Sequence, residues 1–197
     1  MANKLPPIWR GQEYERGGRF GKRVLILGES TYPSPGESTW RYNVAIPEDH
    51  ISGRVRDGFR TKLLRAFLNT DCETPTDIAA FWHSVAFFNY VTKDLVGARL
   101  APTQTDWTHH QPLYQHVRKL RPQLLIVLGF RLWNQLEIQP PCRSVPGPLV
   151  AGAGRPQTCY YGADDGNPVL AYGMRHPSSA FSWRKEHPRL MEVLRLA

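Results

Sequence analysis

Three short segments of the 197-residue chain combine residue types that carry out hydrogen-bonding and acid–base chemistry. They are GESTYP at residues 28–33, NY at residues 89–90 and HPSSAF at residues 176–181. His176 is able to donate a hydrogen bond to a carbonyl oxygen and so stabilise negative charge that develops there. Glu29 is able to orient water or act as a base. The carboxamide of Asn89 is able to pair with a matching donor–acceptor edge, such as that of a pyrimidine.

Each of these side chains also has a structural interpretation. Asn89 can pair with loop backbone, His176 can cap the last helix, and Glu29 can bind neighbouring backbone N–H groups. Tyr32 can wall a flat pocket or simply pack beneath a loop. Ser30 with His176 could mimic a hydrolytic pair, but no clear acid or elbow completes a triad. The chain has no P-loop, no GxSxG elbow and no GxGxxG after a strand, so triphosphate binding is not indicated.

The elements that must position these residues alternate along the chain. Short apolar runs predict strands at residues 24–27, 85–91, 124–128 and 168–172, with a further short strand as an option at residues 158–161. Helices are predicted at residues 59–69, 74–84, 107–120 and 130–136, and from residue 183 or 188 to residue 196. This alternation predicts an α/β fold, a three-layer αβα sandwich with a central, mostly parallel four-stranded sheet.

The polar segments leave the predicted strands at their carboxyl ends, which in a parallel sheet form one rim where ligands bind. We expect a single domain over residues 1–197. Residues 1–21 are predicted to form an N-terminal arm that packs only through Ile8, Trp9 and Phe20. Residues 34–58, rich in Pro, Gly and charge, show no sustained periodicity and are predicted to form a long loop.

The composition limits the possible partners. Lys and Arg number 25 against 17 Asp and Glu, which gives a formal net charge of +8. This excess favours a polyanionic partner, nucleic acid before an acidic membrane, although solubility alone is another explanation. The cysteines at positions 72, 142 and 159 lack metal-ligand spacing and fit a reducing cytosol. With no signal peptide or membrane span indicated, we expect a cytoplasmic monomer without metal or cofactor.

The order of the three segments, each after a strand, resembles the uracil-DNA glycosylase superfamily over about residues 23–185. Members of that family place a G-x-x-P-type loop after the first strand, often an Asn after a middle strand, and an H-P-S-type loop near the end. The resemblance implies cleavage of the N-glycosidic bond of a flipped nucleotide through an oxocarbenium-like sugar, without a metal.

The first loop matches this family only in part. In the best-known uracil-excising branch it reads G-Q-D-P-Y-H, so Gly28 matches the Gly and Tyr32 matches the Tyr that excludes the methyl group of thymine. Ser30 stands where that loop has its water-positioning Asp, and Thr31 stands where it has the Pro. Glu29 resembles the Glu of G-E-A-P-G in the iron–sulfur branch, whose cysteines this chain lacks.

The other two segments match more closely. Asn89, followed by Tyr90, matches the Asn that reads uracil, and His176 matches the His that stabilises the departing base. Ser178 and Ser179 continue the H-P-S pattern, and either Phe181 or Arg184 stands where the family inserts a wedge into the duplex. Basic residues that could grip phosphates are Arg54, Arg56, Arg60, Arg175, Arg184, Lys185 and Arg189, although a solvated basic face explains any one of them.

We therefore expect a DNA glycosylase-like enzyme that excises uracil or a related damaged base from single- or double-stranded DNA. Catalysis is assigned to His176 together with Glu29 or Ser30. Base binding is assigned to Gly28, Tyr32, Asn89 and Tyr90, and DNA binding to Ser178, Ser179, Phe181, Arg184 and Lys185. One alternative, favoured by Ser30 in place of the Asp, is a catalytically weak or inactive nucleic-acid-binding protein with the same fold. Another is an unrelated α/β hydrolase or nucleotide-binding enzyme.

Overall fold

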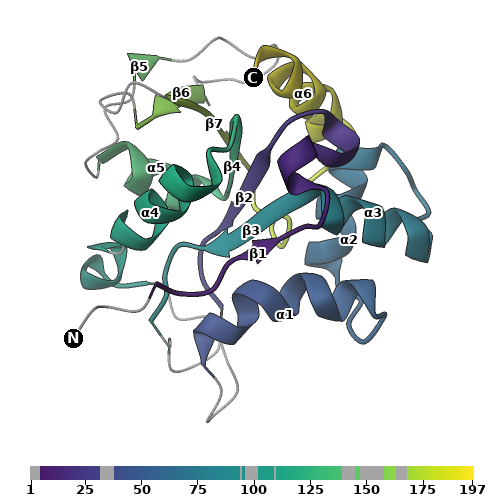
Figure 1. The fold of residues 1–197 in the computed structure, drawn as a ribbon, viewed down its shortest axis with the longest axis horizontal. Helices are drawn as coiled ribbons and strands as arrows, with labels where there is room; N and C mark the ends of the chain where they lie inside the picture. The colour runs from purple at the N-terminus through teal and green to yellow at the C-terminus, as the bar shows by residue number, and fades with distance from the viewer. Residues whose placement is uncertain are drawn as a thin grey trace.

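A mixed, seven-stranded sheet lies at the centre of the protein (Figure 1). The computed structural model describes residues 5–31, 38–93, 95, 102–108, 110–138, 145–146, 158–162 and 168–197. Within these residues the strands lie in the order β1-β3-β2-β4-β7-β6-β5, and helices lie in sequence between the parallel strands β2, β3, β4 and β7. The protein therefore has the predicted α/β class.

The four central strands are parallel to one another and correspond to the four predicted strands. They are β2 (Val24–Gly28), β3 (Val85–Asn89), β4 (Leu124–Leu128) and β7 (Val169–Met174). Every residue of these strands is buried, as expected for apolar runs that are covered on both faces. Each fully buried large aliphatic side chain contributes about 1.5–3 kcal/mol to folding.

The sheet is larger than the predicted four-stranded one. β1 (Trp9–Arg10) pairs antiparallel with β3, β6 (Thr158–Tyr161) pairs antiparallel with β7, and β5 (Val145–Pro146) pairs antiparallel with β6. Of these, only β6 coincides with a predicted strand, the optional one. A two-residue strand is too short to show an alternation of apolar and polar residues, so β1 and β5 left no detectable pattern.

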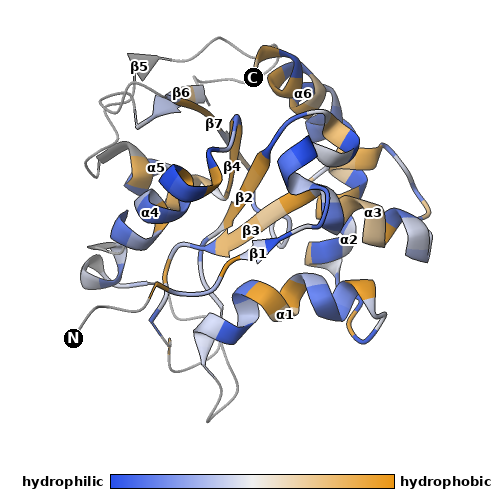
Figure 2. Cartoon of the chain, in the orientation of Figure 1, coloured by the Kyte–Doolittle hydropathy of each residue, from blue (hydrophilic) through white to orange (hydrophobic). Residues whose placement is uncertain are grey.

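Helices cover both faces of the sheet, because successive side chains of a strand point to opposite sides. On one face, α4 (His110–Leu120) and α5 (Phe130–Ile138) share a core with Leu25 and Leu27. On the other, α2 (Gly58–Leu68), α3 (Pro75–Ser84) and α6 (Trp183–Leu196) share a core with Val24 and Ile26. Figure 2 shows these apolar strands between the helices. Within the described residues, no helix has the length and apolar character needed to cross a bilayer.

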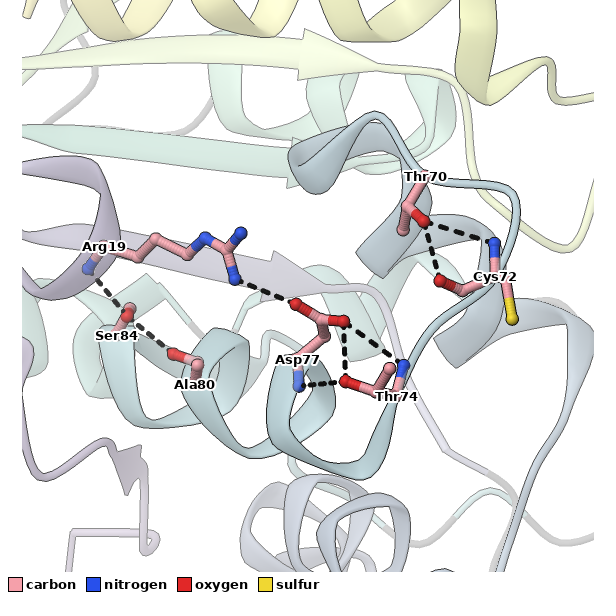
Figure 3. A network of polar contacts seen from close by, with 7 residues as sticks. All are labelled: Arg19, Thr70, Cys72, Thr74, Asp77, Ala80 and Ser84. Atoms are coloured by element: carbon pink, nitrogen blue, oxygen red, sulfur yellow. Dashed lines mark hydrogen bonds and ion pairs between the residues drawn. The ribbon is translucent and has the colours of Figure 1, made fainter.

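The helix α3 begins where the sequence predicts, at a capping box. The hydroxyl of Thr74 accepts a hydrogen bond from the backbone N–H of Asp77 at 3.1 Å, and the Asp77 carboxylate accepts one from the backbone N–H of Thr74 at 3.3 Å. Asp77 also forms an ion pair with Arg19, with 3.1 Å between Oδ1 of Asp77 and Nη1 of Arg19 (Figure 3). This contact joins α3 to the short helical turn η2 (Gly18–Phe20) near the N-terminus.

The N-terminal segment packs more closely than the predicted arm. Besides β1, it contributes Tyr14, whose side chain is fully buried in the core beside α4. The backbone N–H of Arg19 donates to the hydroxyl of Ser84 at 2.8 Å, at the end of α3 (Figure 3). These contacts join segments far apart in the sequence, so no local pattern could predict them.

The prediction of a loop over residues 34–58 is wrong, since α1 (Thr39–Ile51) lies within it. The buried face of this helix includes three polar residues, Thr39, Asn43 and His50, so no apolar stripe marks it in the sequence. Pro47 also lies inside the helix, although proline removes a backbone donor and usually ends a helix.

Contacts with other segments stabilise α1 instead of an apolar stripe. The indole of Trp40 donates to the backbone carbonyl of Thr92 at 3.0 Å. The Nδ1 of His50 accepts a hydrogen bond from the indole of Trp82 at 2.9 Å. Buried hydrogen bonds of this kind determine where the helix lies, and Asn43 of α1 accepts two more of them from Asn89 at the end of β3.

Candidate active site

A cleft opens at the carboxyl ends of the parallel strands. The sheet order reverses between β2 and β4, since β3 lies on one side of β2 and β4 on the other. Ligands of open α/β sheets bind at such a reversal. The cleft has a volume of about 450 Å³ and is lined by Glu29 and Ser30 after β2, by Gly129, Phe130 and Arg131 after β4, and by Arg175, His176, Ser178 and Ser179 after β7. The first and third of the chemistry-bearing segments therefore meet in one cleft.

His176 presents a neutral imidazole to this cleft. Its Nδ1 accepts a hydrogen bond from the backbone N–H of Ser178 at 3.2 Å, so the ring proton belongs to Nε2. Burial lowers the pKa of His176 below its ordinary value, the carboxylate of Glu29 opposes this shift, and the nearby Arg131 adds to it. The Nε2–H is therefore a hydrogen-bond donor that carries no net charge near neutral pH.

Several contacts hold the imidazole of His176 in place. The ring of Phe59, on α2, stacks on it with 5.4 Å between ring centroids and 24° between planes. The backbone N–H and hydroxyl of Ser179 both donate to the carbonyl of His176, at 2.9 and 2.7 Å. Gly129 has a φ of +102°, and a Cβ there would lie 3.4 Å from the Cβ of His176. Glycine is thus suited both to the turn after β4 and to the close approach of the histidine.

Glu29 and Arg131 form a two-pronged ion pair across the cleft. The Nε of Arg131 donates to one carboxylate oxygen at 2.7 Å, and an Nη of Arg131 donates to the other. The Glu29 side chain is only 11% exposed, whereas that of Arg131 is 50% exposed. The pair fixes the carboxylate next to His176 and balances its charge, but it also engages both oxygens that would orient water.

The remaining residues of the first loop are partly described. Ser30 lines the cleft and forms no hydrogen bond with His176, so the described geometry provides no serine–histidine pair for a hydrolase. The hydroxyl of Thr31 is buried without a hydrogen-bond partner among the described residues. Tyr32, which the resemblance assigns to thymine exclusion, lies outside the described residues.

Asn89 lies beside the cleft rather than in it, and it is 2% exposed. Its backbone N–H and its Nδ2 both donate to the Oδ1 of Asn43 on α1, at 2.9 and 3.0 Å, and Asn43 in turn donates to the carbonyl of Pro7. A Cβ on Gly28 would lie 2.3 Å from the Oδ1 of Asn89. In this structure the amide of Asn89 therefore holds the start of the first loop, and its base-reading role stays a prediction.

Tyr90 lies in the core rather than in the described lining of the cleft. Its side chain is fully buried, its ring packs beside Trp107, and its hydroxyl donates to the carbonyl of Trp107 at 2.9 Å. Side chains alternate along the extended backbone, so Tyr90 faces the core of α4 and α5 when Asn89 faces α1. The sequence showed that both residues follow a strand but not which face each one takes.

Three of the residues predicted to contact DNA lie outside the described lining of the cleft, namely Phe181, Arg184 and Lys185. Phe181 is half-buried against the core, so only part of its ring is available as a wedge. Arg184 is exposed, lies over the ring of Trp183 at 4.4 Å and pairs with Asp71. Lys185 is exposed at the start of α6.

The other arginines predicted to bind phosphates differ in whether they are buried or ion-paired. Arg60 is 7% exposed and bonded to Asp57 and the carbonyl of Ile46, so it is structural. Arg54 pairs with Asp49 at 2.7 Å, and Arg189 pairs with Glu186 at 3.1 Å. By contrast, Arg175 is exposed in the cleft, and Arg56 is exposed with no ion pair among the described residues.

Three residues of the site were not predicted to belong to it. Arg131 was recognisable only as part of a strand exit, Phe59 as part of an apolar helical stripe, and Asn43 lay within the supposed loop. These residues reach the site only through tertiary contacts. Arg131, for example, is 102 positions away from Glu29 in the sequence.

No group of three or more His, Cys, Asp or Glu side chains in the described part of the chain is arranged to hold a metal ion. No model of a known protein family matches the chain, and no curated protein matches it in sequence.

Proposed function

We propose that the protein is a DNA glycosylase-like hydrolase that excises uracil or a related damaged base. The supporting observation is the neutral His176, which carries an Nε2–H in the cleft that the first and third loops share. When a base leaves the C1′ of deoxyribose, the bonding electron pair goes to the base and negative charge collects on its carbonyl oxygens. A fixed neutral donor stabilises that charge without having to surrender its proton.

In the proposed reaction, the N-glycosidic bond breaks to give an oxocarbenium-like sugar and an anionic base. Water adds to C1′ and loses a proton, and the base gains one, so the products are a free base and an abasic sugar. Glu29 stabilises the positive sugar and orients the water, with Ser30 as the alternative water-positioning residue. Asn89 contributes by holding Gly28 at the start of this loop.

The cleft also offers positive charge for a DNA backbone. Arg131 and Arg175 both line it, and Arg175 is exposed. A phosphate bound by Arg131 would compete with Glu29 for the same guanidinium and so free a carboxylate oxygen for water. Binding through such contacts weakens steeply as salt concentration rises. A monomeric state and a DNA partner are part of this proposal.

A second candidate is a nucleic-acid-binding protein that keeps the fold but not the chemistry. It is favoured by the engagement of both Glu29 oxygens with Arg131 and by Ser30 in the place of the family's Asp. In this case the cleft would bind a base or a phosphate without cleaving a bond.

The test is base excision from single-stranded and duplex oligonucleotides that contain one uracil, one hypoxanthine or no lesion, followed by alkaline cleavage of abasic sites. Wild-type protein should release a base from at least one lesion. His176→Ala should lower the single-turnover rate about 10²–10³-fold. His187→Ala is the matched control, since His187 contacts the carbonyl of Ala66 outside the cleft.

Excision that survives His176→Ala would overturn the assignment of His176. No excision from any substrate, together with salt-sensitive DNA binding, would support the second candidate and contradict the first.

A further inference from the structure

A second cavity, of about 670 Å³, lies at the opposite end of the parallel strands. Two of the residues that line it, Arg23 and Gln123, directly precede β2 and β4, and a third, Val169, begins β7. Parallel strands begin at one edge of a sheet and end at the other. This cavity is therefore separated from the cleft of His176 by the length of the strands.

The cavity is basic, and we refer to it as the basic cavity. Arg23, Arg118 and Arg121 line it, and no Asp or Glu is among its described lining residues. None of the three arginines forms an ion pair within the described part of the chain. By contrast, Arg131 and Arg184 each pair with a carboxylate. Like charges repel when they converge, so an anion between these guanidinium groups would stabilise the cluster.

The local structure directs these arginines toward the basic cavity. The Nε of Arg23 donates to the backbone carbonyl of Arg121 at 2.8 Å, which orients its guanidinium and leaves its Nη groups for another acceptor. Arg118 extends over the ring of Tyr114, 5.7 Å from its centroid.

Arg121 itself has a φ of +45°, in the left-handed region just after α4, where glycine is the usual residue. The backbone at this position favours glycine, and the arginine found here instead places a third guanidinium group at the basic cavity.

We infer that the basic cavity is a binding site for a phosphate group. Arginine suits this ligand because its planar fork donates two parallel hydrogen bonds to phosphate oxygens. The phosphate could belong to a nucleic-acid strand that extends away from the cleft or to a free phosphate or nucleotide. This inference goes beyond the proposed function, because no residue of the cleft takes part.

The chain contains competing anions of its own, namely the carboxylate of Ala197, which lines the basic cavity, and two aspartates close to it in sequence. Asp164 and Asp165 lie in sequence between two lining residues, Gly162 and Pro168. If the chain's own carboxylates occupied the arginines, wild type would show no affinity for added phosphate, and an Asp164→Asn/Asp165→Asn variant would have a lower Tm and would gain that affinity. That result would overturn the inference. An unchanged Tm with phosphate binding equal to or stronger than wild type would support it.

The main experiment compares Arg118→Gln/Arg121→Gln with wild type in binding a fluorescent 20-nucleotide single strand without any lesion. The double variant should bind about tenfold more weakly at low salt, and its log–log salt slope should fall by about 1.4, since each lost phosphate contact to a single strand lowers it by about 0.7. Arg10→Gln/Arg16→Gln is the control of equal charge, since both arginines pair with glutamates elsewhere on the surface.

Arg121→Gly keeps the test independent of folding. Glycine accepts the left-handed backbone, so the Tm should not fall while phosphate binding does. Inorganic pyrophosphate distinguishes the two sources of the phosphate, with its affinity measured by calorimetry and its competition with the DNA strand measured by displacement. If pyrophosphate binds as tightly as the strand and displaces it, the ligand is a free phosphate. If pyrophosphate does not displace the strand, the ligand is a strand. Excision of uracil at saturating DNA should be unchanged. The inference fails if the Arg118/Arg121 variants behave like the control in both assays.

Discussion

At the carboxyl ends of the parallel strands a carboxylate pairs with an arginine, whereas at the amino ends the described arginines have no carboxylate partner. The cleft holds Glu29 paired with Arg131 and a histidine whose pKa is lowered so that it stays neutral. The basic cavity holds three arginines with no carboxylate partner among the described residues. The strands are buried along their whole length, so polar residues gather only at the two ends.

The difference shows what each end is suited to do. Chemistry on a bound molecule needs donors and acceptors that are fixed before the reaction, and an ion pair with a stacked histidine provides them. Binding a polyanion needs only positive charge that neighbouring carboxylates do not already neutralise. Substitutions at the cleft and in the residues that support it therefore test this contrast.

Removal of the carboxylate should have the largest effect. Glu29→Gln is expected to lower the single-turnover excision rate about a hundredfold or more, because the variant loses the group that orients water and stabilises the sugar. The matched control is Glu13→Gln, which breaks an exposed pair with Arg16 outside the cleft and should leave the rate unchanged. A wild-type rate for Glu29→Gln would shift the water-positioning role to Ser30.

Loss of the support behind the cleft should come next. Asn43→Ala leaves the backbone N–H and Nδ2 of Asn89 without their partner, and an unsatisfied buried group costs about 1–3 kcal/mol. Urea denaturation should show this loss, and excision should slow because the loop at Gly28 loses its anchor. Asn134→Ala, at an exposed position of α5, should change neither quantity. Equal stability of the two variants would contradict the positioning role.

The acid sensitivity of the fold should be separable from that of the cleft. Burial, with help from Arg60, lowers the pKa of His50 to about 4, so protons bind the unfolded chain more readily. The contribution of neutral His50 to the free energy of unfolding is fully present above pH 6.5 and is lost as the pH drops toward 4. At pH 5 this loss is on the order of 1–2 kcal/mol. His50→Gln should lose less stability than wild type between pH 7.5 and pH 5 in chemical denaturation. A parallel loss in both proteins would contradict this assignment.

The smallest effect should be a shift in the pH profile of excision. Activity should persist below pH 6.5 and fall only as the pH drops through the lowered pKa of His176, because protonation of Nδ1 breaks the hydrogen bond from Ser178. Arg131→Gln should move this acid limb to higher pH, since Arg131 lowers that pKa. Glu29→Gln should move it to lower pH, since Glu29 raises it. Shifts in one common direction would rule out His176 as the titrating group.

Much of the framework was predictable because its signals are local. The runs at residues 24–27, 85–91, 124–128 and 168–172 are continuous and apolar, and all four became parallel strands. The start of α3 was also predictable, because the capping box acts within one turn of helix. The helix α1 was missed because its buried face includes polar residues and it contains a proline, so its stability comes from distant partners.

The candidate site was predictable to a more limited extent. His176, Glu29 and Ser30 were expected on one rim, and they line one cleft, because carboxyl ends of parallel strands meet at one edge. The predicted roles of Asn89 and Tyr90 depended on which face each side chain takes, and neither lines the described cleft. That choice rests on Asn43 and Trp107, which no local pattern links to them.

By itself, then, the sequence determined the four central strands, their parallel arrangement and the edge at which polar residues collect, because each of these strands is a continuous apolar run that local residues define. Only the tertiary structure decided that Glu29 pairs with Arg131, that Asn89 pairs with Asn43, and that three arginines at the other edge have no carboxylate partner among the residues the structure describes. A buried polar group must find a partner, and that partner can come from any part of the chain that the fold brings within reach.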